Sequence, residues 1–398
     1  MNAREETIHA PADEAEAAEI VRAAAARGAK LDIIGGGTRH GLGRPSEGGE
    51  QLSTRGLTGI VFHEPAEMTL RVRAGTTLRE VEAALAPHGQ MLPFEPIDHR
   101  ALYGGEGEPT IGGLVATNAS GPRRISAGAA RDSLIGVRLV NGRGECVMSG
   151  GRVMKNVTGL DLVKLVCGAH GALGLVTEAT FKLLPTPQSE RTVVIRRIDG
   201  ERAIAAMTQA LGSPYGVIGA TAIGAGMGRD FPRVFVRLEG FEDSLEARSE
   251  RLIARLAEFG AKHALQGEES QRLWRAVRDV EFLAEPRERA VWRISLQPSK
   301  GARFIAALGA HALDHLYDWG GGLVWLASEP TIEAASAVRA ALAPLGGHAT
   351  LMRAPDELRA RVDVFEPPAP ALARLTKSVT ASFDPHGVFN PGRMYAGI

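Results

Sequence analysis

The sequence has few cysteines, no excess charge of either sign and no long apolar run. Its 398 residues include only 2 Cys, too few for a disulfide framework or for a four-cysteine iron–sulfur or zinc site within the chain. The 46 basic and 46 acidic residues balance. This balance argues against a nucleic-acid-binding protein, because phosphate recognition needs a surplus of Lys and Arg. No stretch approaches the roughly 20 apolar residues of a membrane-spanning helix.

The first residues also lack the charged flank and apolar core of a secretory signal, since Arg4, Glu5, Glu6 and His9 occur there. We therefore expect a cytoplasmic protein that reaches the inner face of a membrane only through partners. With 44% hydrophobic and 23% charged residues, the composition is that of a folded protein. Its length suggests two or three domains, at about 100–200 residues per domain.

The N-terminal half alternates helical and strand-like patterns. An alanine-rich helical pattern begins with acidic residues and ends at Arg27 and Gly28. Thr77 is the expected cap of a second helix. The sequence Asn141-Gly142-Arg143-Gly144 predicts a hairpin turn. The predicted elements are helices over residues 11–29, 77–88 and 161–166, and extended segments over residues 31–34, 60–62, 70–72, 135–140, 145–148 and 175–184.

Pro185-Thr186-Pro187 marks the expected domain boundary. Beyond it, strand-like and helical patterns predict a separate α+β domain and a C-terminal helix. The expected strands are residues 191–197, 233–240 and 291–296, and the expected helices are residues 201–211, 244–259, 300–308, 333–342 and 371–383.

Three glycine-rich segments carry the clearest functional signal. Gly35, Gly36 and Gly37 follow a predicted strand directly, and further clusters occur within residues 110–121 and 168–174. Backbone N–H groups without side chains in the way suit a phosphate or pyrophosphate, whereas the alternative is a tight surface turn. His40 breaks a G-x-G-x-x-G pattern and no G-x-x-x-x-G-K-[ST] occurs, so neither a Rossmann nucleotide site nor a P-loop is predicted. We expect the long Gly- and Pro-rich stretch, residues 95–131, to form functional loops.

The order and spacing of five motifs resemble the FAD-binding domain of the vanillyl-alcohol oxidase and p-cresol methylhydroxylase flavoproteins. The motifs are GGGT after the first strand, TIGGLVATNASG, the Arg131-Asp132 pair, KNVTGLDLVKLVCGAHGALGLVTEATFKLLPTP and a terminal DPHGVFNPG. The resemblance implies an α+β fold with a two-part FAD-binding domain at residues 1–187 and an α+β cap domain at residues 188–365. A C-terminal helix and tail, residues 366–398, would return to the flavin.

The resemblance also implies which residues hold noncovalently bound FAD. The first loop would wrap the pyrophosphate, and the second would pass along the pyrophosphate and the flavin edge. The backbone of Val176 would face the cofactor, and Asn390 would return from the tail to the flavin end. The implied cofactor-binding residues are Gly35, Gly36, Gly37, Thr38, Thr110, Gly112, Gly113, Thr117, Asn118, Ser120, Gly121, Val176 and Asn390.

Within this superfamily the size and compact Gly-rich sequence resemble the FAD-binding E subunits of bacterial glycolate oxidases. This implies a part in electron transfer as glycolate is oxidised to glyoxylate, with a larger FAD-containing subunit and an iron–sulfur subunit as partners. One alternative is a self-contained FAD-dependent dehydrogenase or oxidase of another 2-hydroxy acid or a sugar alcohol. Another is a structural subunit without a cofactor. Larger family members carry a His-rich run in the cap, but residues 318–325 here do not, so the catalytic residues stay unknown.

Several other residues admit a functional and a simpler interpretation. His40 could link a flavin covalently, although a loop histidine is the simpler expectation. His311 and His315, beside Asp314, would share one helical face, where a solvated surface is favoured over a metal site, so no metal is predicted. Cys146 and Cys167 are expected to pack as small buried side chains.

Arginines and tryptophans leave similar alternatives open. Three arginines could neutralise a pyrophosphate or a carboxylate, or could lie exposed in loops: Arg123, Arg124 and Arg131. Four tryptophans could line a flavin-side pocket or pack in the core: Trp274, Trp292, Trp319 and Trp325. We expect a β-branched residue in place of Gly36 to remove the flavin and leave the fold largely intact.

Overall fold

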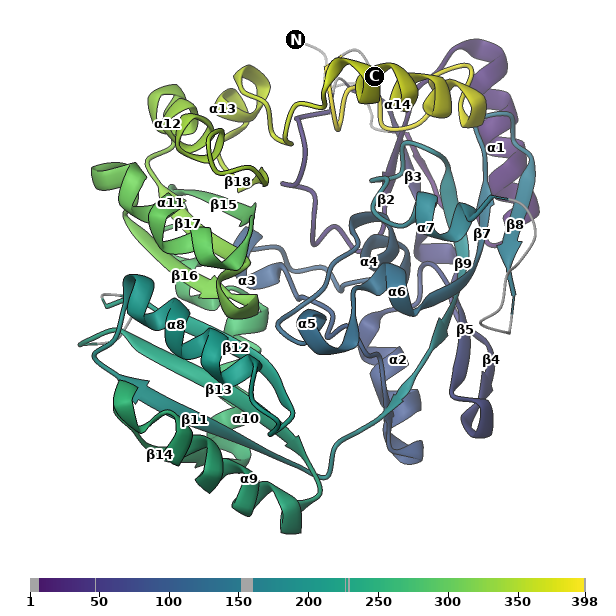
Figure 1. The fold of residues 1–398 in the computed structure, drawn as a ribbon. Coiled ribbons are helices and arrows are strands. Elements are labelled where there is room, and N and C mark those ends of the chain that lie inside the picture. Colours follow the sequence, from purple (N-terminus) through teal and green to yellow (C-terminus); the bar gives the residue numbers. More distant parts are fainter. Residues whose placement is uncertain (1–6, 47, 152–159, 226, 228–229, 397–398) are drawn as a thin grey trace.

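A small parallel sheet begins the chain in the computed structural model, which describes residues 7–46, 48–151, 160–225, 227 and 230–396 (Figure 1). Its strand order is β1-β3-β2, with β1 (Ile8–His9), β2 (Leu31–Ile34) and β3 (Glu50–Ser53). Helix α1 (Glu14–Arg27) begins where the Asp13 side chain accepts a hydrogen bond from the Glu16 N–H, and it ends at Gly28, whose φ is +67°. The predicted first helix and strand are confirmed. Residues 155–159 of the fourth motif lie outside the described residues.

A five-stranded antiparallel sheet follows, in the order β4-β5-β9-β7-β8. The predicted hairpin is confirmed, with Val140 opposite Cys146 across the turn. Thr77 caps the second helix through a reciprocal pair of hydrogen bonds with Glu80. The elements are β4 (Ile60–Glu64), β5 (Thr69–Arg73), α2 (Leu78–Leu85), β7 (Leu134–Val140), β8 (Cys146–Gly150), α7 (Leu162–Val166) and β9 (Leu175–Lys182), and β6 (Gln90–Met91) pairs with β10 (Leu184–Pro185).

Residues 95–131 contain four short helices where the sequence predicts only loops. They are α3 (Arg100–Tyr103), α4 (Ile111–Thr117), α5 (Arg124–Ala127) and α6 (Ala130–Ser133). In α4, Ile111, Leu114 and Val115 are fully buried. Packing of these side chains outweighs the low helix propensity of Gly112 and Gly113, which is why the glycine content misleads a local prediction.

Eight antiparallel strands form the large sheet, in the order β14-β11-β13-β12-β16-β17-β15-β18. The strands are β11 (Ser189–Arg196), β12 (Val217–Ile223), β13 (Arg233–Gly240), β14 (Ala261–Gln266), β15 (Ala290–Ser295), β16 (Asp314–Asp318), β17 (Leu323–Ser328) and β18 (His348–Arg353). One face is covered by α8 (Gly200–Leu211), α9 (Glu242–Arg255), α11 (Gly301–Leu308) and α12 (Ile332–Leu342) (Figure 1).

The other face of this large sheet contacts the N-terminal half of the chain. Trp274 on α10 (Gly267–Arg278) and Trp325 on β17 belong to the same buried cluster as Leu42, Ile97 and Leu102. Apolar residues from both halves are therefore removed from water together, which fixes one half against the other.

The C-terminal segment runs through α13 (Asp356–Arg361) and α14 (Pro370–Phe383) and ends beside the first sheet. The Leu31 N–H donates to the Val388 carbonyl over 2.7 Å, and the Asn390 N–H donates to the Leu31 carbonyl over 3.0 Å. The tail thus lies along β2, and the predicted α+β architecture is confirmed. In the part of the chain that the structure describes, no helix has the length and apolarity needed to cross a bilayer.

Candidate functional site

The glycine-rich segments converge on one groove of about 910 Å³, a volume that includes its open mouth. We call it the glycine groove. Ten of the thirteen predicted binding residues line it: Gly35, Gly36, Gly37, Thr38, Thr110, Gly112, Gly113, Thr117, Val176 and Asn390.

The first loop packs backbone to backbone against residues 105–108. A Cβ atom on Gly36 would lie 1.6 Å from the Glu108 carbonyl oxygen, and one on Gly107 would lie 1.6 Å from the Gly36 carbonyl oxygen. Neither backbone can move away as the tip of a flexible side chain would. Replacement of Gly36 by a β-branched residue must therefore shift this loop pair, so it would disturb local packing as well as the groove.

Two buried hydroxyl groups at the groove have no hydrogen-bond partner among the described residues. They belong to Thr54, which follows β3, and to Thr110, which precedes α4. A buried hydroxyl without a partner costs free energy, so these groups suit a polar ligand that would supply the missing bonds. By contrast, the Thr117 hydroxyl already donates to the Gly113 carbonyl over 2.7 Å.

Two arginines bring positive charge to the glycine groove. The Arg39 Nε donates to His99 Nδ1 over 3.1 Å, and Arg393 donates to the Arg39 and His40 carbonyls over 3.5 and 3.4 Å. Neither forms an ion pair with a carboxylate within the described ranges. Burial lowers the pKa of Arg39 to about 10, and it also lowers the pKa of Arg393, yet the Arg39 guanidinium stays charged at neutral pH. Cationic groups without protein anions suit a diphosphate.

The third glycine loop is tied to β2 by the tail. The Asn390 side chain accepts a hydrogen bond from the Ile33 N–H over 2.8 Å and donates to the His170 carbonyl over 2.9 Å. His170 has a positive φ of 52°. Burial, with a smaller contribution from Arg393, lowers the pKa of His170 to about 4, so its imidazole is neutral at physiological pH.

Three predicted binding residues lie outside the groove and shape the turn after α4. The Asn118 side chain accepts the Arg131 N–H over 3.0 Å, and the Ser120 hydroxyl accepts the Ala130 N–H over 3.0 Å. The Gly121 carbonyl accepts the indole N–H of Trp319 over 3.2 Å, a bond that joins this turn to the large sheet.

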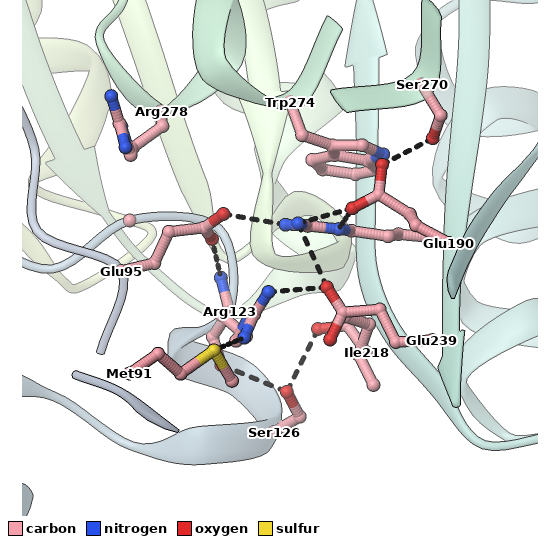
Figure 2. A network of polar contacts seen from close by, with 12 residues as sticks. Met91, Glu95, Arg123, Ser126, Glu190, Ile218, Glu239, Ser270, Trp274 and Arg278 are labelled. Atoms are coloured by element: carbon pink, nitrogen blue, oxygen red, sulfur yellow. Dashed lines mark hydrogen bonds and ion pairs between the residues drawn. The ribbon is translucent and has the colours of Figure 1, made fainter. Parts of the chain in front are cut away.

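Arginines and glutamates form a second polar cluster where the two halves meet (Figure 2). Arg237 on β13 pairs with Glu95 over 2.7 Å, Glu190 over 2.5 Å and Glu239 over 2.9 Å, and Arg123 also pairs with Glu239 over 2.5 Å. Burial alone would raise the pKa of Glu95, but Arg237 and Arg123 hold it below its usual value. Arg123 is thus a buried ion-pair partner, which corrects the expectation of an exposed loop arginine.

Other predictions have mixed outcomes. Cys167 is buried as expected, but Cys146 is exposed, because it begins β8 at the edge of the five-stranded sheet. His311 ends a 3-10 turn and His315 lies on β16, so the shared helical face predicted for them is wrong. Because Asp314–Asp318 pair with β17, the segment that contains His315 is a strand and not a helix. The described residues hold no cluster of three or more His, Cys, Asp or Glu side chains placed for a metal ion.

The remaining arginines, tryptophans and His40 also have defined places. Arg131 and His40 are exposed, as the simpler interpretation predicts, and His40 lies at the rim of the glycine groove. Three tryptophans are core residues at 1–2% exposure: Trp274, Trp292 and Trp325. The partly buried Trp319 instead contacts two arginines, Arg124 and Arg293.

Sequence reasoning missed several residues of the groove wall, and those with polar or charged side chains include Arg39, Thr54, His170 and Arg393. Arg39 and Arg393 each stand next to a recognised motif, GGGT and NPG, and that position is the signal that could have found them. Thr54 has no such signal, because only the parallel pairing of β3 with β2 brings it to the first loop.

Comparisons with known proteins agree with this architecture. A family model for an FAD binding domain matches residues 6–150. Glycolate oxidase subunit GlcE of Escherichia coli K12 is 36% identical over 369 residues, 92% of this chain and 93% of that protein. Glycolate oxidase subunit GlcD of Bacillus subtilis is 31% identical over 168 residues, 42% of this chain and 33% of that protein. The structure of p-cresol methylhydroxylase with substrate bound has a TM-score of 0.72 at 12% identity, and the match covers 97% of this chain and 88% of that one.

The similarity to p-cresol methylhydroxylase concerns the fold alone, whereas the similarity to GlcE spans both sequences nearly end to end. The FAD-domain match contains the first and second glycine-rich segments of the groove. The chain therefore belongs to the GlcE family of FAD-linked oxidoreductases.

Proposed function

We propose that this chain is the FAD-binding subunit of a glycolate-oxidising complex, and that the glycine groove holds FAD without a covalent bond. The observation that carries the proposal is the convergence of ten motif residues on one groove in a chain related to GlcE over nearly its whole length. The unpartnered hydroxyls and the arginines without carboxylate partners support it, because a flavin dinucleotide has both hydrogen-bonding groups and a diphosphate.

In this proposal the different walls of the groove contact different parts of FAD. The backbone of residues 35–37, together with Arg39 and Arg393, would bind the diphosphate. The Thr54 and Thr110 hydroxyls would form hydrogen bonds to the dinucleotide. When bound, FAD supplies two-electron redox chemistry. The α4 residues and Val176 would line its path, and Asn390 would hold the tail at the flavin end.

The turn residues Asn118, Ser120 and Gly121 would act less directly. We propose that they position the flavin-edge loop, since their polar atoms already have partners within the protein. The domain division belongs to the same proposal, with residues 1–187 binding FAD, residues 188–365 capping it and residues 366–398 closing it. His40 would stay an unmodified rim residue.

The proposed partners are a larger FAD-containing subunit and an iron–sulfur subunit. Two cysteines cannot supply the four thiolates of an iron–sulfur cluster, so onward electron transfer through such a cluster requires another chain. The complex would lie in the cytoplasm or at the inner face of the membrane, and would convert glycolate to glyoxylate.

Coexpression of the three chains tests this function. We expect glycolate-dependent reduction of an artificial electron acceptor by the complex, a much lower rate when this chain is omitted, and none from this chain alone. Turnover of another 2-hydroxy acid or a sugar alcohol by the isolated chain would instead support a self-contained enzyme. A complex that forms without this chain and keeps its full activity would contradict the proposal.

A further inference from the structure

Two guanidinium groups meet at one indole ring where the halves of the molecule join. Arg124, on α5, lies 4.8 Å from the ring centre of Trp319, and Arg293, on β15, lies 5.0 Å from it. All three side chains are partly buried. The indole N–H in turn donates to the Gly121 carbonyl, so the large sheet and the turn after α4 both fix this position.

Neither guanidinium has a hydrogen-bond acceptor or an ion-pair partner among the residues that the structure describes. Arg353 shows how a buried arginine is ordinarily satisfied in this molecule, since it donates to five backbone carbonyls at 2.6–3.2 Å. Burial lowers the pKa of Arg293 to about 10, so its guanidinium is still charged at neutral pH. The nearby charge of Arg124 adds to this lowering, so the two like charges repel each other. An anionic ligand at the indole would relieve that repulsion.

The two carboxylates whose charges act on Arg124 and Arg293 accept hydrogen bonds from backbone N–H groups, and one of them is partly protonated at neutral pH. Asp318 accepts the Trp319 N–H over 2.8 Å, and burial raises its pKa to about 7. Asp132, whose charge acts on Arg124, accepts the Ala129 N–H over 2.8 Å. Neither lies within 4.0 Å of the two guanidiniums. The positive charge at Trp319 is therefore not balanced by a direct protein partner.

The site lies close to the glycine groove yet is separate from its diphosphate-binding wall. His99 accepts a hydrogen bond from Arg39, a groove residue, and the charge of Arg293 helps to lower the pKa of the same imidazole after burial and Arg39. The groove has its own arginines for a diphosphate. A second pair of guanidiniums beside it suits a smaller, singly charged anion.

We propose that Arg124 and Arg293 bind the carboxylate group of a small 2-hydroxy acid at Trp319. Guanidinium groups match the planar geometry of a carboxylate, and the indole holds both in place by cation–π contact. The inference rests on the proposed function and deepens it, because it places a substrate-binding site in this chain rather than only in a partner. Arg124 and Arg293 would bind and orient the acid, and the base that removes its hydroxyl proton is not assigned.

Equilibrium dialysis of radiolabelled glycolate against the full-length, FAD-loaded chain tests the site. We expect saturable binding in the wild type, and about tenfold or greater weakening in Arg124→Gln and Arg293→Gln, the loss expected for a charge-assisted bond. Arg293→Lys should lose less, because it keeps the charge without the planar fork. Arg303→Gln is the matched control, since Arg303 is exposed on α11.

Competition on the wild type gives a test that needs no variant. Acetate should displace glycolate, whereas the neutral amide glycolamide should compete at least about tenfold less well, because it lacks the charge. Equal competition, absence of glycolate binding, or unchanged binding in both glutamine variants at full FAD content would overturn the inference. None of these results alters the outcome of the coexpression experiment, so failure of this site is distinguishable from failure of the proposed function.

Discussion

Glycines at the groove serve two different physical purposes. Gly36 permits two backbone segments to touch, as the 1.6 Å approach of its would-be Cβ atom to the Glu108 carbonyl oxygen demonstrates. Gly113 instead leaves space on the groove side of α4, where a Cβ atom would lie 3.1 Å from Arg39 Nη1 and 3.5 Å from Thr110 Oγ1. Substitutions at the two positions should therefore separate folding from cofactor binding.

Gly113→Val should reduce FAD binding while the fold is kept. The valine would project between Arg39 and Thr110, and its nearest neighbour is the movable end of a long side chain. We expect affinity for FAD to fall at least about tenfold, equivalent to about 1.4 kcal/mol. The ratio of flavin to protein absorbance after purification measures this. Ala340→Val, on the exposed side of α12, should keep its FAD, and a Gly113→Val protein with wild-type flavin content would contradict the role of this wall.

Asp318 should make stability depend on pH. Its pKa, about 7 in the folded protein, exceeds the unfolded value of about 3.9, so the folded chain holds an extra proton between them. The free energy of unfolding should thus fall as pH rises through this window, by up to about 1.4 kcal/mol per pH unit from this group. Urea unfolding at several pH values should give a flatter profile for Asp318→Asn. The exposed control Glu333→Gln should keep the wild-type slope, and an unchanged slope in Asp318→Asn would refute the assignment.

Individual residues differ in how far sequence could identify them. The motif residues of the glycine groove could be found because their glycines, hydroxyls and spacing repeat a family pattern. Arg39 and Arg393 could have been found from their places beside two of these motifs. Arg293 could not, because an arginine in a sequence is ordinarily exposed and only tertiary packing brings it to Trp319.

At the scale of elements, the tail acts as a clamp on the glycine groove. Asn390 joins β2 to the third glycine loop, and Asp384 accepts the backbone N–H groups of Val388 and Phe389 over 2.9 and 2.8 Å. These bonds hold a segment nearly at the C-terminus against the first sheet. The tail therefore belongs to the binding site although it is remote in sequence.

Asn390→Ala should loosen this clamp. Loss of the hydrogen bonds to Ile33 and His170 should lower the free energy of unfolding by about 1–3 kcal/mol and weaken FAD binding in parallel. Thermal unfolding with and without added FAD measures both effects. Ser378→Ala, exposed on α14, should change neither. If Asn390→Ala behaves like this control, the tail does not hold the groove.

Elements with strong local patterns could be predicted, and elements made by long-range pairing could not. Helices α1 and α2 carry their own caps, and the β7–β8 hairpin carries its own turn. The spacing of His311 and His315 predicts a helix, but the pairing of β16 with β17 makes the segment at His315 a strand. The order of eight strands in the large sheet has no local signal at all.

At the scale of the whole molecule, the buried ion-pair cluster in Figure 2 joins the two halves. Glu95 comes from the N-terminal half, and Arg237 lies on β13 of the large sheet. The Glu95 side chain also accepts the Arg123 N–H over 3.0 Å, so it fixes the turn after α4 as well. This one carboxylate therefore contributes to the relative position of the groove and the large sheet, together with the apolar cluster between the halves.

Glu95→Gln should lower the free energy of unfolding by about 1–3 kcal/mol, because a buried charge-assisted bond to Arg237 becomes a weaker neutral one. Urea unfolding at low and high salt checks this, and the loss should change little with salt since the pair is shielded from solvent. Glu106→Gln, a substitution at an exposed position, should leave stability unchanged. A loss that disappears at high salt would instead indicate a solvent-exposed pair.

The account as a whole depends on the glycine groove as a noncovalent FAD site. The most direct measurement is acid precipitation of the purified full-length chain, followed by flavin analysis of the supernatant and the pellet. We predict about one FAD per chain, all of it in the supernatant. Flavin that stays with the pellet would contradict noncovalent binding, and a chain that takes up no FAD even after incubation with excess cofactor would contradict the site itself.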